Sequence, residues 1–170
     1  EGLESTLVML AGRLDQRTIA ITDYDRTLPA VPGYPAELNQ VWTNLIVNAI
    51  GAMLAADPPG GTLTVRTARD HDAALVEIID TGPGVPPEIQ QRIFEPFVTT
   101  KSVGQGTGLG LDLSWRIAVT RRHGDLRVVS QPGDTRFQAR LPLPAPAPPT
   151  ARTRQSHCPT SRRSSGEHDD

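Results

Sequence analysis

The chain is poor in several features, and each shortage excludes a class of protein. A single cysteine, Cys158, stands among the 170 residues, so an internal disulfide framework is excluded, which fits a reducing cytoplasm. The formal net charge of -2 gives no reason to expect nucleic acid or a membrane surface as a partner. No apolar run approaches the roughly 20 residues that span a bilayer. We therefore expect this segment to lie in the cytoplasm and to contact neither nucleic acid nor membrane.

The two ends of the chain differ from its centre. There is no initiator Met and no signal-peptide pattern, so we expect a segment cut from a longer protein. From Pro142 onward proline recurs, and Arg, Ser, His and Asp then dominate with almost no large apolar residue. Such a segment buries too little surface to offset the entropy lost on ordering. We predict one domain over residues 1–143 and a disordered tail over residues 144–170.

Hydrophobic spacing predicts helices and strands along most of the chain. Leucines recur at helical spacing near the N-terminus, at Leu3, Leu7, Leu10 and Leu14. Residues 17–22 alternate as a half-buried strand does, with Ile19 and Ile21 on one face. The other expected elements are helices over 36–55, 87–93 and 109–122, strands over 62–67 and 73–80, and a closing hairpin of 127–130 with 137–141. This mixture predicts an α/β domain with one sheet and helices on one face.

Three turns marked by glycine or proline follow one another between Asp80 and Leu111. Glycines alternate at positions 104, 106, 108 and 110, which frees the backbone for positive φ and for close approach of a ligand. The apolar run after them reads as a helix start, and the first amide groups of a helix attract anions, phosphate above all. This pattern predicts a nucleotide pocket with a mobile glycine lid.

The glycines alone leave a second interpretation open. They do not fit the dinucleotide fingerprint, because Leu109 takes the sixth position and no strand immediately precedes them. They are not a Walker loop either, since Lys101 and Ser102 follow Thr100 rather than glycine. A flexible surface loop would have the same composition.

Two asparagines interrupt the apolar part of the long helix predicted over residues 36–55. Asn44 and Asn48 are four residues apart, so they share one face of that helix. Asparagine is a mediocre helix former and is costly to bury without partners. One interpretation is a pair of core asparagines bonded to neighbouring backbone. The other is a side-chain oxygen that binds a hard cation such as Mg²⁺, which shares its oxygen ligands between protein and substrate phosphates.

Asp80 ends an apolar strand and begins a Gly-x-Gly turn. A carboxylate at this point could accept a hydrogen bond from an exocyclic amine and so recognise adenine. Taken alone, an aspartate before glycine is more often a simple turn former.

Together these residues match a known family. The stretches 44–49 (NLIVNA), 80–84 (DTGPG), 93–97 (IFEPF) and 104–111 (GQGTGLGL) resemble the N, first glycine, F and second glycine boxes of sensor histidine kinases. The resemblance is to their catalytic ATP-binding domain, part of the superfamily of gyrase, chaperone, histidine kinase and mismatch-repair ATPases. It covers residues 1–143 and implies the Bergerat fold, a two-layer α/β sandwich with a mixed sheet and helices on one face.

The resemblance also implies roles for individual residues. Asn48 would be the Mg²⁺ ligand, Asp80 would hold the adenine amine, and Asn44, Lys101 and Thr107 would act in catalysis near the phosphates. Phe94 and Phe97 would brace the entrance of the lid, although core packing explains such residues equally well. The residues expected to bind the nucleotide are Asn44, Asn48, Asp80, Gly82, Gly84, Val85, Ile93, Phe94, Phe97, Lys101, Gly104, Gly106, Thr107, Gly108, Leu109 and Gly110.

By the same resemblance, the chain would transfer the γ-phosphate of ATP to a protein histidine. Hydrolytic members of the superfamily carry a Glu at the position that matches Asn44, and Asn cannot activate water as that Glu does. The accepting histidine would lie outside this chain, on a dimerisation domain, and a response regulator would be the further partner. A related serine kinase of the anti-sigma type and a non-catalytic module switched by ATP remain the alternatives.

Overall fold

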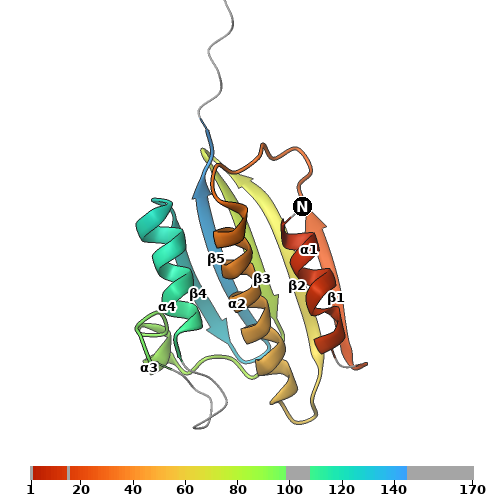
Figure 1. The fold of residues 1–170 in the computed structure, drawn as a ribbon. Helices are drawn as coiled ribbons and strands as arrows, with labels where there is room; N and C mark the ends of the chain where they lie inside the picture. Colours follow the sequence, from red (N-terminus) through yellow and green to blue (C-terminus); the bar gives the residue numbers. More distant parts are fainter. Residues whose placement is uncertain (1, 15, 99–107, 145–170) are drawn as a thin grey trace, which may run out of the picture.

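A computed structural model gives the structure of residues 2–14, 16–98 and 108–144. Helices and strands make up most of these residues (Figure 1). In chain order they are α1 (Gly2–Leu10), η1 (Ala11–Arg13), β1 (Thr18–Tyr24), α2 (Pro35–Leu54), β2 (Gly61–Asp70), β3 (Ala73–Asp80), α3 (Pro87–Gln90), α4 (Gly110–Trp115), η2 (Arg116–Arg121), β4 (Asp125–Gln131) and β5 (Asp134–Pro142).

Within these residues, five strands form one sheet in the order β1-β2-β3-β5-β4. β1 runs parallel to β2, and every other neighbouring pair is antiparallel. Figure 1 shows α1, α2 and α4 on one face of this sheet, with α2 between the other two. The prediction of a two-layer α/β sandwich with a mixed sheet and helices on one face is confirmed.

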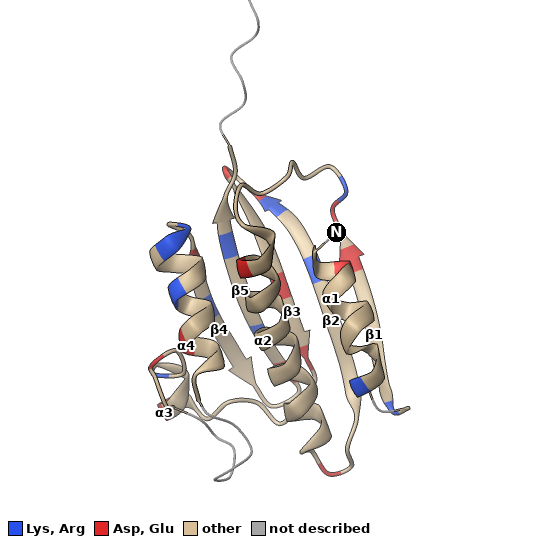
Figure 2. Cartoon of the chain, in the orientation of Figure 1, with Lys and Arg blue, Asp and Glu red and all other residues tan. Residues whose placement is uncertain are grey.

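The helix α2 supplies the largest share of the core. It begins with Pro35 in its first turn, where the missing amide hydrogen costs nothing, and ends before the run Asp57-Pro58-Pro59-Gly60. After Glu37 it carries no charged residue, so its middle can lie against the sheet (Figure 2). Its buried residues recur at helical spacing: Val41, Trp42, Leu45, Ile46, Ala49, Ile50 and Met53.

The helical region after residue 109 has the extent predicted but not the regularity. It begins as the α-helix α4 and continues as η2, a π-helix. The far end is tied to α2, because Glu37 accepts hydrogen bonds from Arg121, at 2.6 Å, and from Arg122. The Arg122 guanidinium also lies over the Tyr34 ring, 5.5 Å from its centre. The start of α2 therefore fixes where this helical region ends.

The strand predicted over residues 17–22 is present as β1, but the prediction that one of its faces is buried is wrong. Ile19 and Ile21 are 63% and 47% exposed in β1. They lie beside Thr62 and Thr64 of β2, on the sheet face opposite the buried Leu63 and therefore away from the helices. Because β1 is an edge strand, its hydrophobic alternation does not report burial.

Candidate functional site

Asp80 lies at the end of β3 and is 1% exposed. Its Oδ1 accepts a hydrogen bond of 2.9 Å from the backbone amide of Gly82, which closes the turn after the strand. Position 82 has no room for a side chain, because an added Cβ would lie 2.7 Å from that same oxygen and 3.2 Å from Cβ of Ala52. The carboxylate is thus held under α2 by a turn that requires glycine.

The electrostatic surroundings of Asp80 favour its neutral form. Burial raises the pKa of this carboxyl to about 6, and the negative charge of Asp134 acts in the same direction. The Gly82 amide opposes the shift, since it donates to the ionised form. A buried carboxyl that titrates near neutral pH is suited to bind a hydrogen-bond donor reversibly.

A polar stripe on α2 connects this turn with the start of α4. Asn44, Asn48 and Ala52 follow at four-residue spacing and share one face of the helix. At one end the Asn44 amide donates to the carbonyl of Gly110 at 2.9 Å, and at the other Ala52 approaches Gly82. Asn48 is half-buried between these two contacts. The stripe therefore brings the first and second glycine-rich stretches to one face of one helix.

The Asn44 side chain makes several hydrogen bonds. Its Nδ2 also donates to Oγ of Ser114 at 3.2 Å, and its Oδ1 accepts from Gln40 at 3.0 Å. Ser114 in turn donates to the carbonyl of Gly110 at 2.8 Å. As one sequence interpretation expected, this asparagine is satisfied in part by neighbouring backbone, and the backbone in question belongs to the glycine-rich stretch.

Comparison with known proteins agrees with this arrangement. A family model described as "Histidine kinase-, DNA gyrase B-, and HSP90-like ATPase" matches residues 33–145. The chain belongs to this family.

Relatives of this ATPase domain are sensor kinases. The sensory histidine kinase/phosphatase NtrB of Salmonella typhimurium is 33% identical over 150 residues, which cover 82% of this chain and 41% of NtrB. NtrB of Rhodobacter capsulatus is 38% identical over 138 residues, covering 74% of this chain and 37% of NtrB. The catalytic domain of histidine kinase ThkA superposes with a TM-score of 0.73 at 25% identity, covering 83% of this chain and 90% of that one. The chain therefore spans about two fifths of the length of its curated relatives.

The F box of this family member divides between core and surface. Ile93 is buried, and the Phe94 ring meets the Phe137 ring edge to face, with centres 6.4 Å apart. Phe97 is 74% exposed, and its amide donates to the carbonyl of Gly108 at 3.1 Å. Core packing thus accounts for Ile93 and Phe94, whereas Phe97 lies at the surface beside the second glycine box.

The described end of the second glycine box lies against the F box and α2. Gly108 has a φ of +67°, and an added Cβ would come within 2.7 Å of the Phe97 backbone, so only glycine suits this position. Leu109 is 40% exposed, and Gly110 faces Asn44. The expected site residues Lys101, Gly104, Gly106 and Thr107 lie outside the described residues.

The first glycine box packs against the hairpin of β4 and β5. The Gly133 amide donates to the carbonyl of Gly82 at 2.9 Å, and Gly84 lies against the backbone of Gln131 and Pro132. The Val85 amide donates to Oγ of Ser130 at 2.8 Å. The tip of the hairpin is therefore one wall of the turn that follows Asp80.

Sequence reasoning missed Thr135. This residue is opposite Asp80 in the antiparallel pair of β3 and β5, so the two side chains point to the same face, and Thr135 is 3% exposed. Its hydroxyl lies 2.7 Å from Oγ of Ser130. The predicted hairpin around residues 131–134 could have suggested the pairing of residues 130 and 135, but not that either stands beside Asp80.

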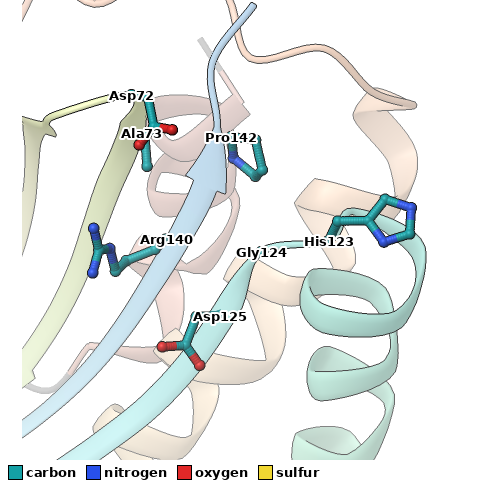
Figure 3. Close-up of a pocket in the computed structure, with 7 residues that line it drawn as sticks. All are labelled: Asp72, Ala73, His123, Gly124, Asp125, Arg140 and Pro142. Carbon is teal, nitrogen blue, oxygen red and sulfur yellow. The ribbon is translucent and has the colours of Figure 1, made fainter.

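A shallow pocket of about 240 Å³ lies at the other end of the same strands (Figure 3). It is formed where Ala73 pairs with Pro142, whereas Asp80 pairs with Thr135 at the opposite end of β3. Arg140 in its wall is bonded to Asp70 at 2.9 Å. His123, with a φ of 54°, lies at the turn after η2. This pocket is separate from the stretches that carry the family motifs.

Residues 2–14, 16–98 and 108–144 contain no cluster of three or more His, Cys, Asp or Glu able to hold a metal ion. In the same part of the chain, no helix has the length and apolar character needed to cross a membrane.

Proposed function

We propose that this chain binds ATP between α2 and the two glycine boxes and transfers its γ-phosphate to a protein histidine outside the chain. The observation that carries the proposal is the stripe of Asn44, Asn48 and Ala52. It links the buried Asp80 turn to the start of α4 along one helix face. A ligand with a base at one end and phosphates at the other fits such an arrangement.

The base lies at the Asp80 end. The exocyclic amine of adenine donates to the Asp80 carboxylate. Because this carboxylate is buried, water competes little for the hydrogen bond. Gly82 and Gly84 let the base approach the backbone, and Val85 packs beside it. Thr135, buried opposite Asp80, supplies a hydroxyl to the same end.

The phosphates lie at the α4 end. Asn44 fixes the carbonyl of Gly110 and so orients the first turn of the helix that follows the glycine box. Lys101, Thr107 and the amides of Gly104, Gly106, Gly108 and Leu109 bind the phosphate chain. Asn48 would hold Mg²⁺, and a bound Mg²⁺ would neutralise charge on the transferring phosphoryl group.

The residues at this end favour transfer over hydrolysis. Phosphoryl transfer needs positioning and charge neutralisation more than covalent help from the protein. The amide of Asn44 has no basic group that could take a proton from water, and its atoms are bonded to Gln40, Gly110 and Ser114.

The acceptor is a histidine on a dimerisation domain, either elsewhere in a longer chain or on a separate protein. This fits the fact that the chain spans only 41% of the Salmonella NtrB sequence. A response regulator then receives the phosphate. Residues 1–143 form the ATP-binding domain, and the domain acts in the cytoplasm. The tail predicted to be disordered lies, apart from residue 144, outside the described residues.

Phosphate transfer to an added acceptor tests this function. The 170-residue chain is mixed with Mg²⁺, ATP labelled in its γ-phosphate, and the part of Salmonella NtrB that the chain does not match. We expect label on that acceptor that is stable in alkali and lost in acid, as for phosphohistidine. A parallel mixture contains an anti-sigma-factor antagonist in place of the NtrB part, and label on it that survives acid would favour the serine kinase. ATP binding without transfer in either mixture would favour a non-catalytic module.

The affinity for ATP should fall about tenfold between pH 7 and pH 5. Burial raises the pKa of Asp80 to about 6, and the adenine amine binds only the ionised carboxylate, so proton and ATP compete for one group. ATP therefore binds with full affinity well above the pKa of Asp80, and the affinity falls as the pH drops below it. The measurement is a binding titration at each pH. Asp80→Asn serves as control, because its pH dependence reports only the phosphates of ATP.

A further inference from the structure

Ser130, near the end of β4, holds together three segments at the base end of the site. Its Oγ accepts the Val85 amide at 2.8 Å, from the turn after Asp80. The same oxygen lies 2.7 Å from Oγ1 of Thr135 on β5. Its backbone carbonyl accepts from Nε2 of Gln90 at 2.9 Å, and Gln90 also donates to the Val85 carbonyl at 2.8 Å.

The strand register places Ser130 one step from Asp80. Ser130 pairs with Thr135 across β4 and β5, and Thr135 pairs with Asp80 across β5 and β3. Residues directly opposite in antiparallel strands point to the same face, so all three side chains form a row on the helix-covered face. Asp80 and Thr135 are 1% and 3% exposed, so water is largely kept from this row.

The Val85 amide determines how protons are arranged along the row. An amide can only donate, so the Ser130 oxygen accepts from it and keeps its own proton for another partner. A hydroxyl that accepts one hydrogen bond becomes a better donor, which favours donation from Ser130 to Thr135. The Thr135 hydroxyl, having accepted from Ser130, then has its own proton left to donate beside Asp80.

We propose that Ser130 is a positioning residue for adenine recognition, because it makes the Thr135 hydroxyl a donor to a ring nitrogen of the base. The inference rests on the proposed function. Adenine carries two ring acceptors next to its amine, N1 and N7. With Asp80 bonded to the amine, a donor on the neighbouring strand reaches one of them. The base is then recognised by one acceptor and one donor of the protein.

The test compares ATP with 1-deaza-ATP and 7-deaza-ATP, each of which lacks one ring acceptor. Binding titrations use the 170-residue chain and its variants Ser130→Ala, Ser130→Thr and Gln90→Met. Ser130→Ala should weaken the binding of ATP about fivefold more than the binding of one of the two deaza nucleotides, because that nucleotide lacks the acceptor in any case. Ser130→Thr keeps the hydroxyl and should restore wild-type behaviour. Gln90→Met loosens the same junction without touching the Thr135 hydroxyl, so it should weaken all three nucleotides alike.

Several results would overturn the inference. A Ser130→Ala loss that is equal for all three nucleotides would mean that Ser130 only packs the hairpin, and so would an unchanged affinity for ATP. A nucleotide dependence in Gln90→Met equal to that of Ser130→Ala would have the same meaning. If Ser130→Ala does not fold, Thr135→Val gives the same comparison with the same two outcomes. Failure of the wild-type chain to bind ATP would instead reject the proposed function itself.

Discussion

Replacing Asp80 by asparagine should weaken ATP binding by about a hundredfold, because a hydrogen bond to a charged group contributes about 1.5–3 kcal/mol. The asparagine side chain has the same shape but no charge. Its NH2 group is a hydrogen-bond donor, as the adenine amine is, so one of the two carboxylate acceptors is lost. Since Asp80 is 1% exposed, water cannot replace the lost bond. The measurement is a binding titration with ATP and Mg²⁺ at pH near 7.

The loss should not come from unfolding. Burial raises the folded-state pKa of Asp80 above its unfolded value of about 3.8, so the free energy of unfolding falls as the pH rises from about 3.8 to about 6, and the full cost is present above that. Asparagine removes that cost, and Asp80→Asn should unfold at an equal or higher urea concentration than wild type. Asp72→Asn, the same change at the exposed far end of the sheet, should leave both properties unchanged. Equal ATP affinity in the two variants would remove Asp80 from the site.

Local sequence was sufficient for features determined by neighbouring residues. The turn after Asp80 could be predicted because Gly82 is close to it in the chain, and the structure gives the reason, a contact of 2.7 Å that any Cβ would make. The core face of α2 followed from its spacing, since seven of its apolar residues are buried. The four motifs also predicted the fold, because their order along the chain is typical of one family.

Features that depend on strand order could not be predicted in this way. Ile19 and Ile21 alternate as buried residues do, but β1 lies at the edge of the sheet, and nothing local indicates an edge. Thr135 and Ser130 come beside Asp80 only because β5 lies between β3 and β4, with a register that pairs residues 55 positions apart. The sequence likewise contained no sign that η2 would be a π-helix.

The two asparagines of α2 combine a feature that the local sequence predicts with one that only the fold determines. Spacing alone placed Asn44 and Asn48 on one face, but the partner of Asn44 is Gly110, 66 positions away. Only the fold shows that this face meets both glycine boxes. The two interpretations of the pair are compatible for Asn44, which bonds to backbone at the very stretch expected to bind phosphates. Asn48, one turn further along, is the residue for which a metal role can be tested alone.

Replacing Asn48 by alanine should lower the rate of phosphate transfer at least about a hundredfold, because a metal ion contributes several kcal/mol to stabilising charge in the transition state. Asn48 lies between the Gly110 contact of Asn44 and the Gly82 contact of Ala52, where a metal bound to phosphate oxygens would need a ligand. The affinity for ATP should fall when Mg²⁺ is present and stay within about twofold of wild type in EDTA, since a neutral amide adds little binding to phosphates without a cation.

The dependence on Mg²⁺ separates a metal ligand from a packing residue. An asparagine that only packs against neighbouring segments would, when replaced, weaken ATP binding equally with and without the ion. Asn39→Ala provides the matched control, because Asn39 is a half-buried asparagine of the same helix that lies beside Gly2, away from both glycine boxes. It should change neither ATP affinity nor transfer. If Asn48→Ala behaves like Asn39→Ala, the metal must be held elsewhere, and the role of the polar stripe reduces to the link that Asn44 makes with α4.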